Sequence, residues 1–190
     1  MRLYSMPSSG NSYKVRLLLA LLGRDCEIVD VEYQTEALDQ ARAQGRLPFG
    51  KAPVLELDDG RLLPESNAIL WWLGEGTRFV PADAFARAEM ASWMFWEQNQ
   101  HEAVIAVRGA LAYYPHRRAL ATPERMAELL ERGHALLQIM EDRLDGRDWL
   151  VGDGPTLADL CLYGYTHTAG SRSGFDICLL YTSDAADDTP

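Results

Sequence analysis

The chain has 190 residues, of which 47% are hydrophobic and 24% are charged, a composition typical of a globular protein with a sizeable core. Its 28 acidic and 18 basic residues give a net charge of −10, which argues against a general nucleic-acid-binding protein. The sequence shows neither a run of about 18 apolar residues nor the features of a signal peptide, so we expect a cytoplasmic protein without a membrane partner. The three cysteines and four histidines lack the spacing of a metal site, so we expect no metal.

Strand and helix signals alternate over the first 80 residues. Alternating or β-branched residues mark the strands, apolar residues at helical spacing mark the helices, and Gly23 closes the first helix. The turn at Asp59-Gly60 predicts a hairpin, and Ser66 after it is a typical helix cap. The predicted elements are strands at residues 2–5, 26–33, 54–57 and 61–63, and helices at 15–22, 36–44 and 67–76.

Strand signals stop after residue 80, and the remaining patterns are helical. Thr122 followed by Pro123 starts one of these helices, and Thr156 with Asp159 has the spacing of a capping box at the start of another. The fold class is therefore α/β plus all-α. The predicted helices cover residues 83–111, 122–146 and 154–169, and the predicted domains are residues 1–79 and 84–176.

Three stretches of the sequence resemble the glutathione S-transferase family. They are YSMPSSGNSYKVRLLL from Tyr4, GKAPVLELDDGRLLPESNAILWWL from Gly50 and GDGPTLADLCL from Gly152. The first is similar to serine-type and bacterial members, with a zeta- or nu-like motif, more than to the tyrosine-type animal classes. The resemblance covers about residues 1–170. It implies a thioredoxin-like N-terminal domain followed by a helical-bundle C-terminal domain, and a homodimer.

The resemblance places a glutathione-binding site in the N-terminal half. Pro53 is similar to the family's cis-proline, after which the Val54 backbone pairs with the cysteinyl backbone of glutathione like an added strand. Ser66, at the start of a helix, binds the γ-glutamyl carboxylate, because free N–H groups and the helix dipole attract an anion there. Glu65 then faces the ammonium group of glutathione, and Lys51 pairs with its glycyl carboxylate.

The same resemblance places the glutathione sulfur at the turn before the first helix, which contains no cysteine. An unperturbed thiol has a pKa of about 8.5, and a hydrogen bond to the anion lowers that pKa. We expect Ser9 to be the main donor and Asn11 a second one, although some bacterial members use an amide as the main donor. Under the alternative interpretation, Ser8, Ser9 and Asn11 are only turn and cap residues.

Other polar and aromatic residues have structural interpretations. Lys14 is expected to set the helix start or an interface rather than to touch a ligand. Five rings of the helical half either pack in the core, the interpretation that we favour, or line a cleft for the second substrate. They are Trp93, Trp96, His101, Tyr113 and Tyr114.

The last residues, 177–190, do not continue the helical pattern. The stretch CLLYTSDAAD within them resembles the translation of a transposase adapter used in sequencing libraries. We therefore expect a non-native tail at residues 177–190 and a helical domain that is truncated relative to the natural protein.

The resemblance implies a cytoplasmic transferase that uses glutathione as co-substrate, without a metal, and presents its thiolate to a small electrophile. The reaction is conjugation or glutathione-dependent reduction. Two alternatives stay open: a glutathione-dependent isomerase of the zeta-like type, and a non-enzymatic interaction module with the same fold.

Overall fold

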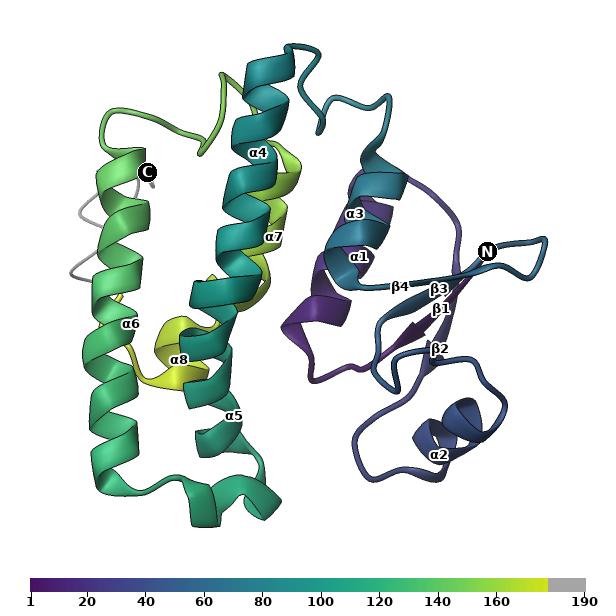
Figure 1. Ribbon diagram of the computed structural model, residues 1–190, viewed down its shortest axis with the longest axis horizontal. Coiled ribbons are helices and arrows are strands. Elements are labelled where there is room, and N and C mark those ends of the chain that lie inside the picture. Colours follow the sequence, from purple (N-terminus) through teal and green to yellow (C-terminus); the bar gives the residue numbers. More distant parts are fainter. Residues whose placement is uncertain (178–190) are drawn as a thin grey trace, which may run out of the picture.

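The computed structural model describes residues 1–177 (Figure 1). The predicted tail, apart from residue 177, lies outside these described residues. Four strands form one mixed sheet in the order β2-β1-β3-β4, in which β1 runs parallel to β2 and antiparallel to β3, and β3 and β4 form the predicted hairpin. The strands are β1 (Arg2–Ser5), β2 (Glu27–Asp30), β3 (Val54–Glu56) and β4 (Leu62–Pro64).

Helices cover both faces of the sheet. The elements of this part follow one another in the predicted β-α-β-α-β-β-α order. In Figure 1, α1 and α3 lie between the sheet and the helices of the C-terminal part, whereas α2 lies on the other side of the sheet. Buried side chains of β1 and β3 alternate between the faces: Leu3 and Leu55 pack under α1 and α3, and Tyr4 and Val54 pack with α2. The helices are α1 (Gly10–Leu21), α2 (Glu36–Ala43) and α3 (Ser66–Gly74).

The C-terminal part is helical, as predicted, but residues 83–111 are not one regular α-helix. Their middle is a ten-residue π-helical segment, η1, which nothing in the sequence pattern indicates. Single π-helical turns within α-helices are frequent at functional sites. The elements are α4 (Ala84–Trp96), η1 (Glu97–Ala106), α5 (Val107–Tyr113), the 3₁₀-helix η2 (Pro115–Leu120), α6 (Pro123–Leu144), α7 (Leu157–Thr166) and α8 (Ala169–Ser173).

Helix ends follow the local capping signals with one exception. Thr122 caps α6, and Thr156 and Asp159 form the predicted capping box of α7. The prediction that Ser66 caps α3 is wrong, because Glu65 occupies the cap position and Ser66 is the first helical residue. The Ser66 hydroxyl is thereby free to reach another helix.

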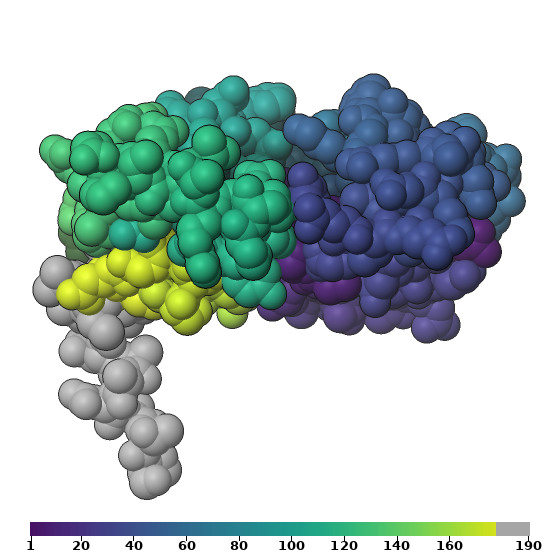
Figure 2. Space-filling view, turned by 90° about the horizontal axis from the view of Figure 1, so that it is seen from below, coloured from purple at the N-terminus to yellow at the C-terminus, as the bar shows by residue number. Residues whose placement is uncertain are grey.

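One hydrophobic core runs through both parts of the chain, including Leu18 of α1, Leu70 of α3 and Leu162 of α7. The two parts lie side by side in Figure 2, purple to blue against teal to yellow. Helices α1 and α7 approach closely because Gly10 faces Gly164: a Cβ on Gly10 would lie 2.5 Å from the Gly164 carbonyl oxygen. Within residues 1–177, no helix has the length and apolar character needed to cross a membrane.

Candidate functional site

Five of the predicted site residues line one small pocket at the junction of the two domains. The pocket has a volume of about 110 Å³, and its walls come from α1, η1, the loop before β3 and the start of α3. Val54 follows this loop, with its side chain fully buried in the sheet. The predicted residues in the pocket wall are Asn11, Lys51, Pro53, Glu65 and Ser66.

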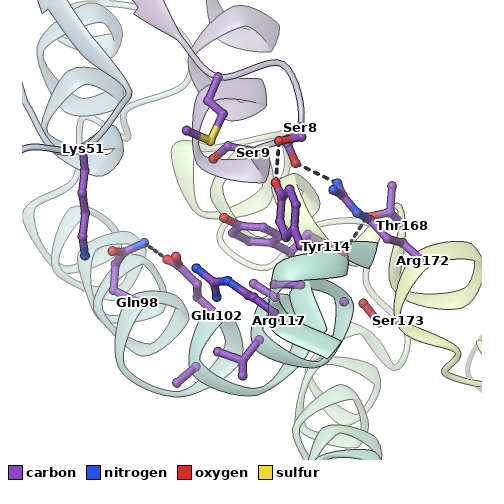
Figure 3. Close-up of a pocket in the computed structure, with 17 residues that line it drawn as sticks. Ser8, Ser9, Lys51, Gln98, Glu102, Tyr114, Arg117, Thr168, Arg172 and Ser173 are labelled. Carbon is purple, nitrogen blue, oxygen red and sulfur yellow. Dashed lines mark hydrogen bonds between the residues drawn. The ribbon is translucent and has the colours of Figure 1, made fainter. Parts of the chain in front are cut away.

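A wider cleft adjoins the small pocket. Its volume is about 430 Å³, and Ser9 lies in its wall (Figure 3). Lys51, Gln98 and Glu102 line both cavities. The structure therefore places the two expected thiolate donors on adjoining cavities, Asn11 on the small pocket and Ser9 on the wide cleft.

The loop before β3 and the start of α3 form one end of the small pocket. The Ala52–Pro53 peptide bond is cis, as the resemblance implied. At the start of α3, Glu65 has a φ of 72°, in the left-handed region that residues other than glycine seldom adopt, and its side chain makes no capping hydrogen bond. The first N–H groups of α3 therefore lack a cap from Glu65, a feature that favours an anionic ligand.

Asn11, in the first turn of α1, is held by side chains from three other positions. Its Oδ1 accepts hydrogen bonds from Lys14 Nζ at 2.7 Å and from Ser66 Oγ at 3.0 Å. Its Nδ2 donates a hydrogen bond to Glu102 Oε1 at 2.8 Å. These contacts fix which side of the amide carries the nitrogen, and they use one of its two hydrogens, so the other is left for a ligand.

A buried ion pair behind Asn11 joins the two domains. Lys14 Nζ lies 2.8 Å from Glu97 Oε2, and both side chains are fully buried. Burial alone would lower the pKa of Lys14, but nearby Cys161 and Glu97 raise it above its ordinary value, so the lysine stays charged. Of the two structural roles expected for Lys14, at the helix start or at an interface, the structure shows the interface.

Ser9 caps α1 and lies beside a half-buried tyrosine of α7, Tyr165. Its Oγ accepts a hydrogen bond from the Ser12 N–H at 3.4 Å. Burial raises the pKa of Tyr165 well above its ordinary value, although hydrogen bonds from the Ser9 side chain and the Asn11 backbone lower it in part. Tyr165 is therefore a neutral hydroxyl that lies beside Ser9 in the wall of the wide cleft.

Comparison with known proteins supports both halves of this arrangement. Residues 3–77 match the family model of the glutathione S-transferase N-terminal domain, and residues 104–173 match that of the C-terminal domain. A glutathione S-transferase-like protein, LUC7, from Fusarium is 31% identical over 172 residues, which are 84% of this chain and 73% of the relative. The chain belongs to the glutathione S-transferase family.

Two further proteins are similar to this chain over most of its length. The crystal structure of a possible transferase from Rhodopseudomonas palustris is 41% identical, with a TM-score of 0.87, and the match covers 95% of this chain and 88% of that one. A maleylacetoacetate isomerase from Rhizobium meliloti is 30% identical over 172 residues, or 88% of this chain and 80% of the relative.

Several residues that line the wide cleft are not predicted from the sequence. Gln98 and Glu102 come from the π-helical segment, and Tyr165, Arg117 and Arg172 come from later helices. Burial and the charge of Glu97 raise the pKa of Glu102. No local signal marks these residues, because they reach the site only when α7, α8 and η1 pack on the N-terminal domain.

The aromatic rings considered in the sequence divide between core and cleft. Trp93 and Trp96 pack against the main core, and His101 is fully buried, as the favoured interpretation predicted. Tyr114 instead lines the wide cleft, and Tyr113 lies next to it, on an adjoining depression. The described residues contain no group of three or more histidine, cysteine, aspartate or glutamate side chains that could hold a metal.

Proposed function

We propose that the chain is a glutathione transferase that binds glutathione in the small pocket and a small electrophile in the wide cleft. One observation carries the proposal. Residues that are distant in sequence and that match glutathione-binding motifs line a single pocket, and Ser9 lies in the wall of the cleft that adjoins it. A Pseudomonas fluorescens protein of this fold, 21% identical with a TM-score of 0.79, was crystallised with two glutathione molecules.

In this proposal each polar group of glutathione has a partner in the pocket. The γ-glutamyl carboxylate binds the first N–H groups of α3 and the Ser66 hydroxyl, whose hydrogen turns from Asn11 Oδ1 to the carboxylate when glutathione binds, and Glu65 faces the ammonium group. Lys51, which is exposed at the rim, pairs with the glycyl carboxylate. The Val54 backbone, next to the cis peptide, pairs with the cysteinyl backbone.

The thiolate lies where the two cavities adjoin. The hydroxyl of Ser9 is the main donor to it, and the free hydrogen of the Asn11 amide is the second. Neither group acts as a base; both stabilise the anion and so lower the pKa of the bound thiol. Tyr165 stays protonated beside Ser9 and can donate to the same anion.

The thiolate then attacks an electrophile in the wide cleft, by conjugation or by reduction through a mixed disulfide. The match to the Rhizobium isomerase favours one alternative, glutathione-dependent isomerisation of a double bond in the same cleft. The third possibility, an interaction module without activity, would have no use for glutathione, so glutathione binding separates it from both enzymes.

Calorimetric titration with glutathione tests the binding site. Glu65→Gln and Ser66→Ala should each weaken binding by about 1–3 kcal/mol, the usual effect of losing a hydrogen bond to a charged group. Glu75→Gln, an exposed acid just past the end of α3, is the matched control and should bind as the wild type does. Unchanged affinity in both pocket variants would show that glutathione does not bind here.

We also propose that the chain forms a homodimer through α3 and α4. Exposed Phe95 and Trp72 lie on these helices, and an apolar depression of about 370 Å³ lies between them, lined by Trp71 and Met94 among others. Sedimentation should give a dimer for the wild type and a monomer for Phe95→Glu. Phe85→Glu, which also changes an exposed ring of α4, should stay dimeric.

The cytoplasmic location of the protein stays a prediction from its sequence.

A further inference from the structure

The wide cleft carries positive charge although the chain as a whole has a net charge of −10. Lys51, Arg117 and Arg172 line it, and Glu102 is the one carboxylate among its described lining residues. Glu102 already accepts hydrogen bonds from Asn11 and Gln98. In Figure 3, the two arginines come from the helical domain, and Ser8 and Ser9 come from the turn before α1.

Arg117 supplies a charge without an acidic partner. It lies on η2, half-buried, with its guanidinium carbon 5.9 Å from the centre of the Tyr114 ring. Within residues 1–177 its guanidinium forms no ion pair and no hydrogen bond, and it contacts the Tyr114 ring. A guanidinium in this state is suited to a planar anion such as a carboxylate, which it can bind through two parallel hydrogen bonds.

Arg172 approaches the same tyrosine and is held in place. Its Nη1 donates a hydrogen bond to the Ser8 carbonyl at 2.7 Å, and its guanidinium carbon lies 4.0 Å from the centre of the Tyr113 ring and 5.8 Å from that of Tyr114. The Tyr114 hydroxyl is hydrogen-bonded to Ser8 Oγ. Glu32 accepts hydrogen bonds from the Ser8 N–H and hydroxyl, and Arg172 lies close enough for its charge to help lower the pKa of Glu32, but Glu32 does not line the wide cleft.

We propose that the second substrate carries a carboxylate that binds Arg117 and Arg172 beside Tyr114, with its electrophilic carbon directed toward Ser9. This inference rests on the proposed function. It follows from the geometry because both guanidiniums and the expected thiolate donor share one cleft. The carboxylate belongs to the small electrophile; a second glutathione molecule, which bears the same group but no electrophilic carbon, is an outcome that the test must exclude.

A matched pair of probes tests the inference: 4-chloro-3-nitrobenzoate, which is anionic, and 4-chloro-3-nitrobenzamide, which is neutral. In both, the glutathione thiolate attacks the carbon that bears chlorine, a C–S bond forms, and chloride leaves with the electron pair of the C–Cl bond. Each kcat/KM is divided by the rate of free glutathione with the same probe, which removes the difference in intrinsic reactivity.

We expect the normalised kcat/KM to be at least about tenfold higher for the benzoate than for the benzamide, the usual effect of a charge-assisted hydrogen bond. Arg117→Gln should lower this ratio about tenfold, and Arg172→Gln should lower it as well. Arg118→Gln is the control, because Arg118 is the next residue of the same 3₁₀-helix but is exposed and lies outside the cleft wall. It should keep the wild-type ratio. Equal normalised rates for the two probes, or a ratio that persists in Arg117→Gln, would overturn the inference.

Calorimetry keeps this test separate from the proposed function. Both probes are titrated into protein that was saturated with S-methylglutathione, which cannot react. Tighter binding of the benzoate that is lost in Arg117→Gln supports the inference even if no turnover occurs, whereas equal binding contradicts it. Titration with S-methylglutathione alone comes first: a second equivalent that disappears in Arg117→Gln would show that the two arginines bind a second glutathione and would overturn the inference, whereas a single equivalent shows that the wide cleft is open to the probes.

Discussion

Replacing Lys14 with methionine should reduce the free energy of unfolding by about 3–5 kcal/mol. The substitution keeps an unbranched side chain of similar length against α7, where Lys14 packs on Gly164. It removes the cation that lies 2.8 Å from Glu97, and it leaves that carboxylate buried without a counter-charge.

The magnitude follows from two opposing contributions. At the 2.8 Å separation of Lys14 and Glu97, an effective dielectric constant of about 20 gives an attraction of about 6 kcal/mol. Transfer of the two ions from water costs several kcal/mol each, so the intact pair contributes little net stability. A single substitution removes the attraction but leaves one desolvated charge, and therefore costs more than the pair contributes.

Urea unfolding of the wild type, Lys14→Met and the double variant Lys14→Met/Glu97→Leu measures these contributions at neutral pH. The double variant should recover most of the loss, because no buried charge remains. Arg125→Met is the control: it breaks the exposed pair with Glu128 and should leave the unfolding free energy unchanged. A Lys14→Met protein within about 1 kcal/mol of the wild type would refute the reasoning.

Three further predictions concern the domain interface and the helix starts. Burial lowers the pKa of His101 from 6.5 to about 4, so between these values the unfolded chain binds a proton that the folded chain does not. The unfolding free energy of the wild type should therefore fall relative to that of His101→Asn as the pH is lowered from 7 to 5, and parallel pH profiles would contradict this. Gly10→Ala should cost about 1–3 kcal/mol in urea unfolding, because the added Cβ would lie 2.5 Å from the Gly164 carbonyl; a cost near zero would mean that α1 and α7 separate easily. Thr156→Ala should cost about 1 kcal/mol through loss of the α7 capping box, and an unchanged thermal midpoint would contradict that role.

The sequence predicts the features that local physics determines. Caps such as Thr122 and the capping box of Thr156 and Asp159 act within one helical turn, and the structure has them where the spacing places them. The hairpin likewise depends on the local turn at Asp59-Gly60, where Gly60 has a φ of 85°. The pocket residues that flank this hairpin are predicted because one contiguous stretch of sequence resembles the glutathione S-transferase family.

Features that depend on packing between distant segments were not predictable. Lys14 and Glu97 are 83 positions apart. Nothing in the local sequence of either helix shows that these charged side chains are buried, because they are buried and paired only when α1 and η1 pack together. The sequence predicts Ser66 as a cap because serine commonly caps helices, but its hydroxyl donates to Asn11 on another helix. Arg117 and Arg172 lie on short elements without a motif, and only the fold places them in one cleft.

The ultraviolet absorbance of the bound glutathione thiolate, followed against pH, tests the central claim most directly. In the wild-type complex the thiol should titrate clearly below the ordinary pKa of about 8.5. Ser9→Ala should raise this pKa by about one to two units, the equivalent of one charge-assisted hydrogen bond, with little change in glutathione affinity, and Asn11→Ala should raise it less. If the wild-type complex titrates like free glutathione, or if neither substitution moves the pKa, the turn before α1 is only a helix cap and the proposed catalytic role is wrong.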